Sequence, residues 1–277
     1  MRPRLESTRR LLRRWLTSIA FLALVGVVLG AVIAPLLISK PNVAVITISG
    51  IVTHQEYVDD VLAMLQYARE DHNIRAVVLR IDSPGGSASA TEEIFLDVLR
   101  TRQLKPVVAS IGSIGASGGY YVATAANVIY AEPSSQIGSI GVWSRLPLPE
   151  ELDEDILTSG PFKATGFSRQ KAVAHLEMVR QGFVEAVRLQ RGDRLKLTEE
   201  ELSTAEIYLG IDAFRFGLID GIDTMTAAIE EAASLAGLRH YELVELVVGN
   251  PPPVNLEALR SQTGLAPVYY FLHFEQE

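Results

Sequence analysis

The chain has 277 residues and no cysteine, which excludes disulfides, thiolate metal sites and a cysteine nucleophile. Its formal net charge is −8, and because residues 1–40 carry seven basic side chains and one acidic one, residues 41–277 carry the remaining −14. An acidic main portion argues against nucleic acid as a partner, since binding to phosphates calls for a basic face.

The chain begins with a basic segment and an uncharged apolar run, the pattern of a membrane signal anchor. Residues 1–14 contain six arginines, and residues 15–38 contain no charged side chain. Roughly 24 helical residues extend about 36 Å, enough to cross a hydrocarbon core of about 30 Å. We expect residues 1–14 in the cytoplasm, a single span of the cell membrane at 15–38, and the rest on the extracytoplasmic side. Cleavage near Val32-Ile33-Ala34, as in a signal peptide, is the alternative.

Strands and helices alternate after the predicted anchor. Strands are predicted at residues 43–48, 75–81, 106–111 and 127–131, and helical patterns lie between them at about residues 58–65, 94–99 and 118–126. Strands that alternate with helices need crossover connections, so we expect an α/β fold with a mainly parallel sheet and flanking helices. In such folds the ligand site lies beyond the carboxyl ends of the strands.

The second half of the chain has a more helical pattern. One face of a long helix is predicted from Ala172, Leu176, Val179, Phe183 and Val187. A short edge strand is expected at 217–220, a helix at 224–236 and a last strand at 241–248. We expect one domain at 41–249 and a C-terminal extension at 250–277, which opens with three prolines and ends in aromatic residues. That aromatic end could pack on a neighbouring subunit, rest on the membrane surface or cover the core.

Ser117 has the surroundings of a nucleophile. It lies in Gly115-Ala116-Ser117-Gly118-Gly119, where a predicted strand gives way to a helix. Small neighbours allow a sharp turn and the close approach of a substrate carbonyl, and the first amides of the helix point at any oxyanion formed there. The pattern predicts a serine hydrolase and leaves the identity of the base open.

Four stretches follow one another in a recognisable order. They are Leu79-Arg80-Ile81-Asp82-Ser83-Pro84-Gly85-Gly86, Ala116-Ser117-Gly118-Gly119-Tyr120-Tyr121, Ile137-Gly138-Ser139-Ile140-Gly141-Val142 and Ser159-Gly160-Pro161-Phe162-Lys163. With them, and with Gly217-Leu218-Ile219-Asp220 further on, the chain resembles the short form of the signal peptide peptidase A family. These are membrane-anchored serine peptidases of family S49 with a ClpP/crotonase-like fold. The resemblance runs from about residue 43 to residue 223, and the predicted anchor agrees with it.

The resemblance implies a role for five residues. Ser117 would be the nucleophile and Lys163 the general base, with Ser139 hydrogen-bonding the lysine amine and the amides of Gly86 and Gly118 forming the oxyanion hole. A lysine with an ordinary pKa of about 10.4 is protonated at neutral pH, so it needs a desolvated setting to act as a base. The apolar neighbours of Lys163 in the sequence predict such a setting. Gly85 is the alternative amide donor.

Three other interpretations remain open. The sequence around Ser117 also fits the nucleophile turn of α/β-hydrolase esterases, whose acid and histidine would come from Asp212 or Asp223 and from His240 or His273. A stomatin-associated type of membrane serine protease would share the fold and the dyad and differ in its substrate. A catalytically inactive membrane scaffold is the candidate outside the enzymes.

The chain departs from the family pattern in three places. Ile137 stands where a threonine is common, and the connection at 143–158 is short and acidic. Ala205-Glu206-Ile207 replaces a more usual Gly-Arg pair. The first departure could alter a hydrogen bond near the lysine and the second could reshape the substrate pocket, but none removes a predicted catalytic group.

The sequence therefore predicts a membrane-tethered serine endopeptidase. The resemblance implies cleaved signal peptides and unfolded chains as substrates, contact with the lipid bilayer through the N-terminal helix, and a ring-shaped homo-oligomer. No metal-ligand cluster and no nucleotide-binding glycine loop occurs in the sequence, so neither a metal nor a cofactor is expected.

Overall fold

The computed structural model describes residues 41–145 and 159–250, together with residues 15, 18–19, 21–27 and 29 of an N-terminal helix. The chain divides into two units, Met1–Lys40 and Pro41–Glu277. The described N-terminal residues are helical and mostly exposed. Among all the residues described, no helix is both long enough and apolar enough to cross a membrane. The predicted span at 15–38 is only partly within the described residues. The predicted cytoplasmic segment 1–14, the C-terminal extension from residue 251 and most of the acidic connection lie outside them.

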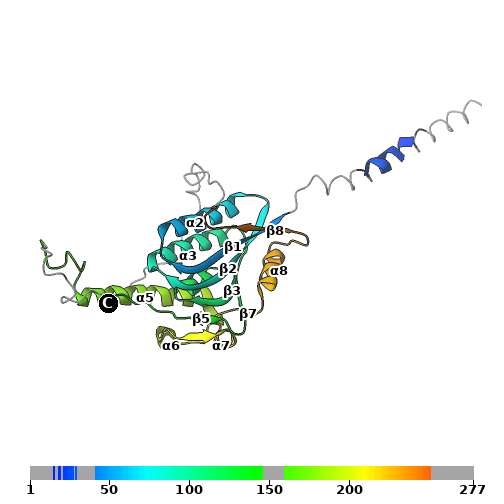
Figure 1. Ribbon diagram of the computed structural model, residues 1–277. Coiled ribbons are helices and arrows are strands. Elements are labelled where there is room, and N and C mark those ends of the chain that lie inside the picture. Colours follow the sequence, from blue (N-terminus) through cyan, green and yellow to red (C-terminus); the bar gives the residue numbers. More distant parts are fainter. Residues whose placement is uncertain are drawn as a thin grey trace, which may run out of the picture. The chain divides into compact units, whose positions relative to one another are not determined.

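The second unit is built on a twisted, mainly parallel sheet (Figure 1). In the described part of the chain its strands are β1 (Asn42–Val52), β2 (Ile74–Gly86), β3 (Val107–Ala116), β4 (Val128–Ala131), β5 (Gln136–Gly138), β6 (Ile207–Leu209), β7 (Gly221–Ile222) and β8 (Glu242–Leu246). The main path runs β6-β5-β3-β2-β1-β8, with β4 beside β3 and β7 beside β4. Only the β5–β6 pair is antiparallel among these strands. The predicted α/β class is confirmed.

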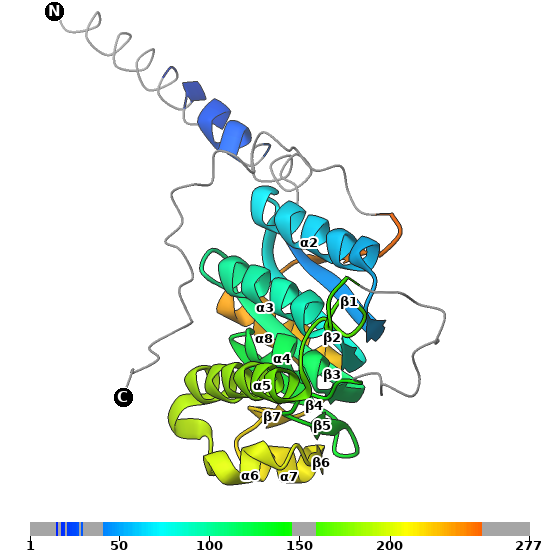
Figure 2. The same ribbon diagram turned by 90° about the vertical axis from the view of Figure 1, so that its left-hand side faces the viewer.

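Helices cover both faces of the sheet (Figure 2). They are α2 (Gln55–Glu70), α3 (Ala88–Arg102), α4 (Gly118–Thr124), α5 (Arg169–Arg191), α6 (Glu199–Ser203), α7 (Gly210–Arg215) and α8 (Met225–Leu235), with a 3-10 turn at Gly192–Arg194. Strand β1 shows how its apolar residues divide between the faces. Ala44 and Ile46 belong to the main core with helices α2 to α5, whereas Val43 and Val45 pack with α8 in a smaller cluster. Side chains alternate across a strand, so both faces of this run are buried.

The first three strands are longer than the sequence predicts. Strand β2 does not end at Ile81 but continues through the glycine turn to Gly86, β1 continues to Val52, and β3 continues to Ala116. The pairing skips one residue near Gly50, where β1 and β2 bulge and then resume. A bulge absorbs the extra residue and tolerates a proline that an ordinary ladder would not.

The predicted edge strand at 217–220 is wrong, because this segment ends helix α7 and the strand β7 follows it. Gly217 has φ +76, and the amide of Leu218 donates to the carbonyl of Ala213 at 2.8 Å. A left-handed glycine with such a hydrogen bond is a common end of a helix.

Helix α5 is long, as predicted, but only half of its predicted apolar face is buried. Phe183 and Val187 lie in the core, whereas Val179 is 43% exposed. Figure 1 shows the N-terminal half of α5 extending beyond the sheet. The periodicity of the sequence identified the apolar face of α5. It could not indicate which part of the helix packs against the rest of the domain.

Candidate active site

Ser117 lies in a strained turn between the end of β3 and the start of α4. Its φ is 51°, and only Ser139 and Ala205 share a positive φ with it among the described non-glycine residues. The Ser117 amide donates to the carbonyl oxygen of Gly138 at 2.8 Å, which holds the turn against strand β5. Such backbone strain costs about 1–3 kcal/mol and is concentrated at functional sites.

The two glycines after Ser117 let neighbouring elements come close. A Cβ atom on Gly118 would lie 2.5 Å from a methyl carbon of Thr91 in α3. A Cβ atom on Gly119 would lie 2.4 Å from the carbonyl oxygen of Ser83 in β2. Both separations are too short for real atoms, so the need for small residues after Ser117, read from the sequence, has a direct steric cause.

Ser139 follows strand β5 in the same way that Ser117 follows β3. The parallel pairing of β3 with β5 places Ala116 opposite Gly138, so the next residues of the two strands, Ser117 and Ser139, lie side by side. Ser139 has φ 52°, and its amide donates to the carbonyl oxygen of Glu206 at 2.8 Å. The structure therefore brings these two predicted site residues together.

The first glycine turn lies against the serine turn. Gly85 has φ +101, and a Cβ atom on it would lie 2.7 Å from the Gly118 nitrogen and 2.9 Å from the Ser117 Cβ atom. The Gly85 amide already donates to the Ser83 hydroxyl at 3.1 Å. Its amide is thus in use, which favours Gly86, an exposed residue, over Gly85 as a donor to a ligand.

Lys163 is not joined to these residues in the single chain. It lies in a turn before α5, where its amide donates to the carbonyl oxygen of Gly160 at 3.1 Å. Lys163 and its neighbours Phe162 and Ala164 are exposed, and its ammonium group has no hydrogen-bond or ion-pair partner among the described residues. The desolvated setting expected from the sequence is absent from the described part of this chain.

The topology of the sheet separates His240, one of the two histidines of the esterase alternative, from Ser117. His240 is exposed and precedes β8, so it lies at the amino end of a strand that runs parallel to β1. Ser117 follows the carboxyl end of β3, at the opposite end of the sheet. Asp212 forms an exposed ion pair with Arg215, and His273 lies outside the described residues. Within one chain, Ser117 therefore cannot form a triad with His240.

Sequence reasoning missed a buried polar cluster behind α4. Asp220 accepts hydrogen bonds from both terminal nitrogens of Arg191, at 2.8 and 2.9 Å, and from the amide of Ile129 at 2.8 Å. Burial by itself raises the pKa of the Asp220 carboxyl, but the bonds and charge of Arg191 outweigh it, and that pKa lies below its ordinary value. The Tyr120 hydroxyl of α4 donates to the Leu218 carbonyl beside this cluster. Only its position in Gly217-Leu218-Ile219-Asp220 singled out Asp220 in the sequence.

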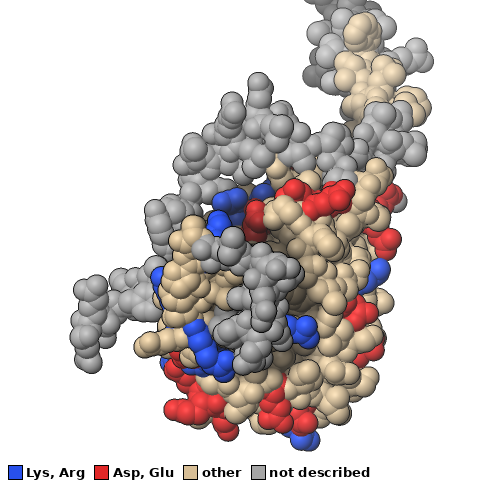
Figure 3. Space-filling view, turned by 60° about the vertical axis from the view of Figure 1, so that its left-hand side comes forward, with Lys and Arg blue, Asp and Glu red and all other residues tan. Residues whose placement is uncertain are grey.

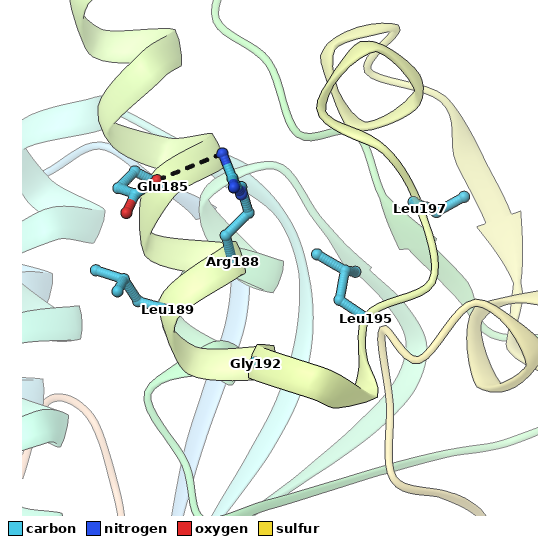
Figure 4. A pocket seen from close by; sticks show the side chains of 6 residues that line it. All are labelled: Glu185, Arg188, Leu189, Gly192, Leu195 and Leu197. Atoms are coloured by element: carbon cyan, nitrogen blue, oxygen red, sulfur yellow. Dashed lines mark ion pairs between the residues drawn. The ribbon is translucent and has the colours of Figure 1, made fainter.

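A hollow of about 350 Å³ lies at the C-terminal half of α5, and no residue of the serine turns lines it (Figure 4). It is lined by Glu185, Arg188, Leu189, Gly192, Leu195 and Leu197. Glu185 and Arg188 form an ion pair of 3.9 Å across part of it. None of its lining residues is a nucleophile or an unpaired base, so this hollow does not have the chemistry of a hydrolytic site.

Charges are mixed on the face that Figure 3 shows. Its basic side chains form small groups separated by acidic and uncharged ones. No group of three or more potential metal ligands occurs among the described residues.

The chain matches known peptidases over this region. The family model for peptidase family S49 matches residues 100–239, and the model for Clp protease matches residues 40–137. Protease 4 of Haemophilus influenzae is 31% identical over an alignment of 202 positions, which covers 68% of this chain and 32% of the relative. The chloroplastic serine protease SPPA of Arabidopsis thaliana is 29% identical, over 74% of this chain and 32% of the relative. The chain thus spans about a third of the length of these relatives.

A solved structure has the same fold. A serine-to-alanine mutant of the 1510-N membrane-bound stomatin-specific protease is 17% identical, with a TM-score of 0.50, and covers 76% of this chain and 99% of its own. At this identity the likeness concerns the fold alone. The S49 match covers half of the chain and includes the serine turn, the Ser139 turn and the Lys163 segment. The chain therefore belongs to peptidase family S49, as an SppA-type member.

Proposed function

We propose that this protein is a membrane-anchored serine endopeptidase in which Ser117 is the nucleophile and Lys163 the general base. The observation that carries the proposal is the strained turn at Ser117, held between the Gly85 backbone and strand β5 in a chain of the S49 family. A serine held in this way at the carboxyl edge of a parallel sheet is exposed to a ligand and rigid.

The proposed reaction is acyl transfer in two steps. Lys163, in its neutral form, takes the proton of the Ser117 hydroxyl as the oxygen attacks the scissile carbonyl carbon. The amides of Gly86 and Gly118 donate to the oxyanion, and each such donor is worth about 3–4 kcal/mol in comparable enzymes. The proton then passes to the leaving amine, and a water molecule hydrolyses the acyl enzyme. Ser139, beside Ser117, would hold the lysine amine in line.

The exposure of Lys163 bears on how the site is completed. Desolvation favours the neutral amine that a general base needs, so the exposed Lys163 must be covered before catalysis. Bound substrate or a second subunit could supply the missing cover. We propose a homo-oligomer, ring-shaped like that implied by the family resemblance, and the long exposed half of α5 beside Lys163 is compatible with a subunit contact there.

The proposed substrates are cleaved signal peptides and unfolded chains. The support comes from the N-terminal sequence, in which six arginines precede the apolar residues 15–38. Such an anchor would hold the catalytic domain beside the extracytoplasmic surface of the membrane, where spent signal peptides are found.

The test uses the full chain in detergent. Wild type, Ser117→Ala and Lys163→Ala are compared for cleavage of a synthetic apolar signal peptide and of an unfolded protein, with the oligomeric state measured for each. Ser113→Ala and Lys171→Ala are the matched controls, because both replace exposed residues near the same elements. We expect at least a thousandfold loss of kcat in the two site variants and less than a twofold change in the controls.

Mixing the Ser117→Ala and Lys163→Ala variants distinguishes a site formed within one subunit from a site shared by two subunits. Recovery of activity on mixing would mean that Lys163 of one subunit acts on Ser117 of another. An active Lys163→Ala variant would remove Lys163 as the base, and a folded but inert wild type would favour the scaffold interpretation.

A further inference from the structure

We infer that Ser83 is a positioning residue of the proposed peptidase, because its hydroxyl holds the Gly85–Gly86 turn in place beside Ser117. The inference rests on the proposed function and adds to it a residue that does not touch the substrate. Its side chain is fully buried, with 0% of its surface exposed.

Ser83 lies at the bulge between β1 and β2. Here one residue of β1, Gly50, faces two residues of β2, Ser83 and Pro84. Pro84 has no amide hydrogen and cannot donate to the opposite strand. The Ser83 hydroxyl donates to the Gly50 carbonyl oxygen instead, at 2.6 Å. The side chain thus supplies the cross-strand hydrogen bond that the proline cannot make.

The same hydroxyl accepts a hydrogen bond from the next glycine. The Gly85 amide donates to the Ser83 oxygen at 3.1 Å, and Gly85 is buried. Removing the hydroxyl would leave this amide unpaired away from water, and an unpaired buried group favours any rearrangement that gives it a partner. The peptide units on either side of Gly85 would then lose the contact that fixes their orientation.

The orientation of this turn matters because of what it packs against. Gly85 lies so close to the serine turn that a Cβ atom on it would be 2.9 Å from the Ser117 Cβ atom. The proposed donor Gly86 is the next residue, so a rotation of the peptide at Gly85 moves its amide relative to Ser117. Oxyanion donors act only when they are aimed at the developing charge, and small displacements reduce their effect.

A second buried serine provides a matched control. Ser135 is 1% exposed, donates its hydroxyl to the carbonyl oxygen of Gly112 and accepts the amide of Glu132 at 3.0 Å. Its hydroxyl therefore bridges a carbonyl and an amide as that of Ser83 does, but it holds the turn before β5 and not the glycine turn. If the Ser83 hydroxyl had only a structural role, Ser83→Ala and Ser135→Ala should reduce stability and activity to a similar extent.

The experiment compares full-length wild type, Ser83→Ala and Ser135→Ala in detergent. Thermal unfolding and oligomeric state are measured first, followed by kcat and KM on an apolar peptide and the affinity for a peptide boronate. A boronate forms a tetrahedral adduct with the serine and places an oxygen where the oxyanion would lie. We expect Ser83→Ala to lower kcat and boronate affinity about 10- to 100-fold with KM within threefold. Ser135→Ala should change each of these less than threefold.

Each other outcome has a distinct meaning. An active wild type with equal losses in the two serine variants, or a raised KM with unchanged kcat in Ser83→Ala, would overturn the positioning role and leave the proposed function standing. A folded wild type that neither cleaves peptide nor binds the boronate would overturn both. If Ser83→Ala does not fold, Ser83→Cys carries the test, because its somewhat larger thiol fills the space of the hydroxyl and forms only weak hydrogen bonds. An unchanged kcat in Ser83→Cys would then overturn the role.

Discussion

The amide of Ser139 donates a 2.8 Å hydrogen bond to the carbonyl oxygen of Glu206, a residue 67 positions later in the chain. Ala205, the residue before Glu206, has φ 56°, so both sides of this contact have a left-handed backbone at a non-glycine residue. That conformation costs roughly 1–2 kcal/mol for a residue with a side chain. Because this strained hydrogen bond lies next to Ser117, we expect the β5–β6 contact to influence the geometry of the serine turn.

The contact between Ala205 and Gly141 can be tested with a double-mutant cycle. A Cβ atom on Gly141 would lie 2.6 Å from the Ala205 Cβ atom. We expect Gly141→Ala to lower the free energy of unfolding by about 1–3 kcal/mol through this clash, and also to lower kcat. Adding Ala205→Gly should restore much of both, with a coupling energy of about 0.5–3 kcal/mol in chemical unfolding. Additive effects of the two substitutions would show that the two residues do not meet.

The stability of the domain should depend on pH through Asp220. Its carboxyl pKa is lowered from 3.8 in the fold, so its ionised form stabilises the folded state above that pH, and the contribution disappears as the pH falls through the lower folded value. We expect Asp220→Asn to lower the free energy of unfolding at pH 7 by about 3–5 kcal/mol, because the buried Arg191 is left without an opposite charge.

The difference between Asp220→Asn and wild type should shrink as the pH falls below about 4. Urea unfolding at pH 7 and pH 3 measures it. A difference that stays the same at both pH values would mean that the carboxyl charge has no part in the effect.

Helices α2 and α3 are joined by a buried ion pair that should contribute far more than an exposed one. Arg69 and Asp97 meet at 2.6 Å with side chains 2% and 9% exposed, whereas Arg215 and Asp212 meet at 3.1 Å with side chains 71% and 44% exposed. We expect Asp97→Ala to cost about 3–5 kcal/mol, since it leaves a buried guanidinium unpaired. Asp212→Ala should cost less than about 1 kcal/mol. The denaturant midpoints of Asp97→Ala and Asp212→Ala measure this difference. Similar midpoints would contradict the burial of the Arg69–Asp97 pair.

We expect the buried part of α5 to begin near Phe183, so that truncating this side chain destabilises the domain. Its ring packs edge-on against Tyr121 at a centroid distance of 4.9 Å, and it is 8% exposed. Removing a buried phenylalanine ring typically costs about 3–5 kcal/mol. Val179 lies one turn earlier on the same face. In the monomer, Val179→Ala should lower the free energy of unfolding by less than about 1 kcal/mol.

The comparison of Phe183→Ala and Val179→Ala also bears on assembly. A large cost at Val179 that grows with protein concentration would show that a second subunit covers the exposed half of α5. A large cost that does not depend on concentration would contradict the exposure of Val179.

Local sequence determined much of what the structure contains. Runs of β-branched residues predicted strands β1, β2 and β3, and glycine patterns identified the turns at Gly85–Gly86 and at Ser117. These features depend on neighbours in the chain, since backbone propensity and steric size act over a few residues. The order of the four motifs was sufficient to predict the S49 family, and the family comparison confirms it.

Only the tertiary structure decided how these pieces meet. The parallel register of β3 with β5 places Ser139 beside Ser117, and the β5–β6 pairing brings Glu206 to Ser139. The burial of Asp220 with Arg191 and the exposure of Lys163 were equally invisible in the sequence. Each depends on contacts between residues far apart in the chain, and a local pattern carries no information on register, burial or partner. The sequence therefore determined which residues could form the site, and the packing of the sheet decided which of them meet within one chain.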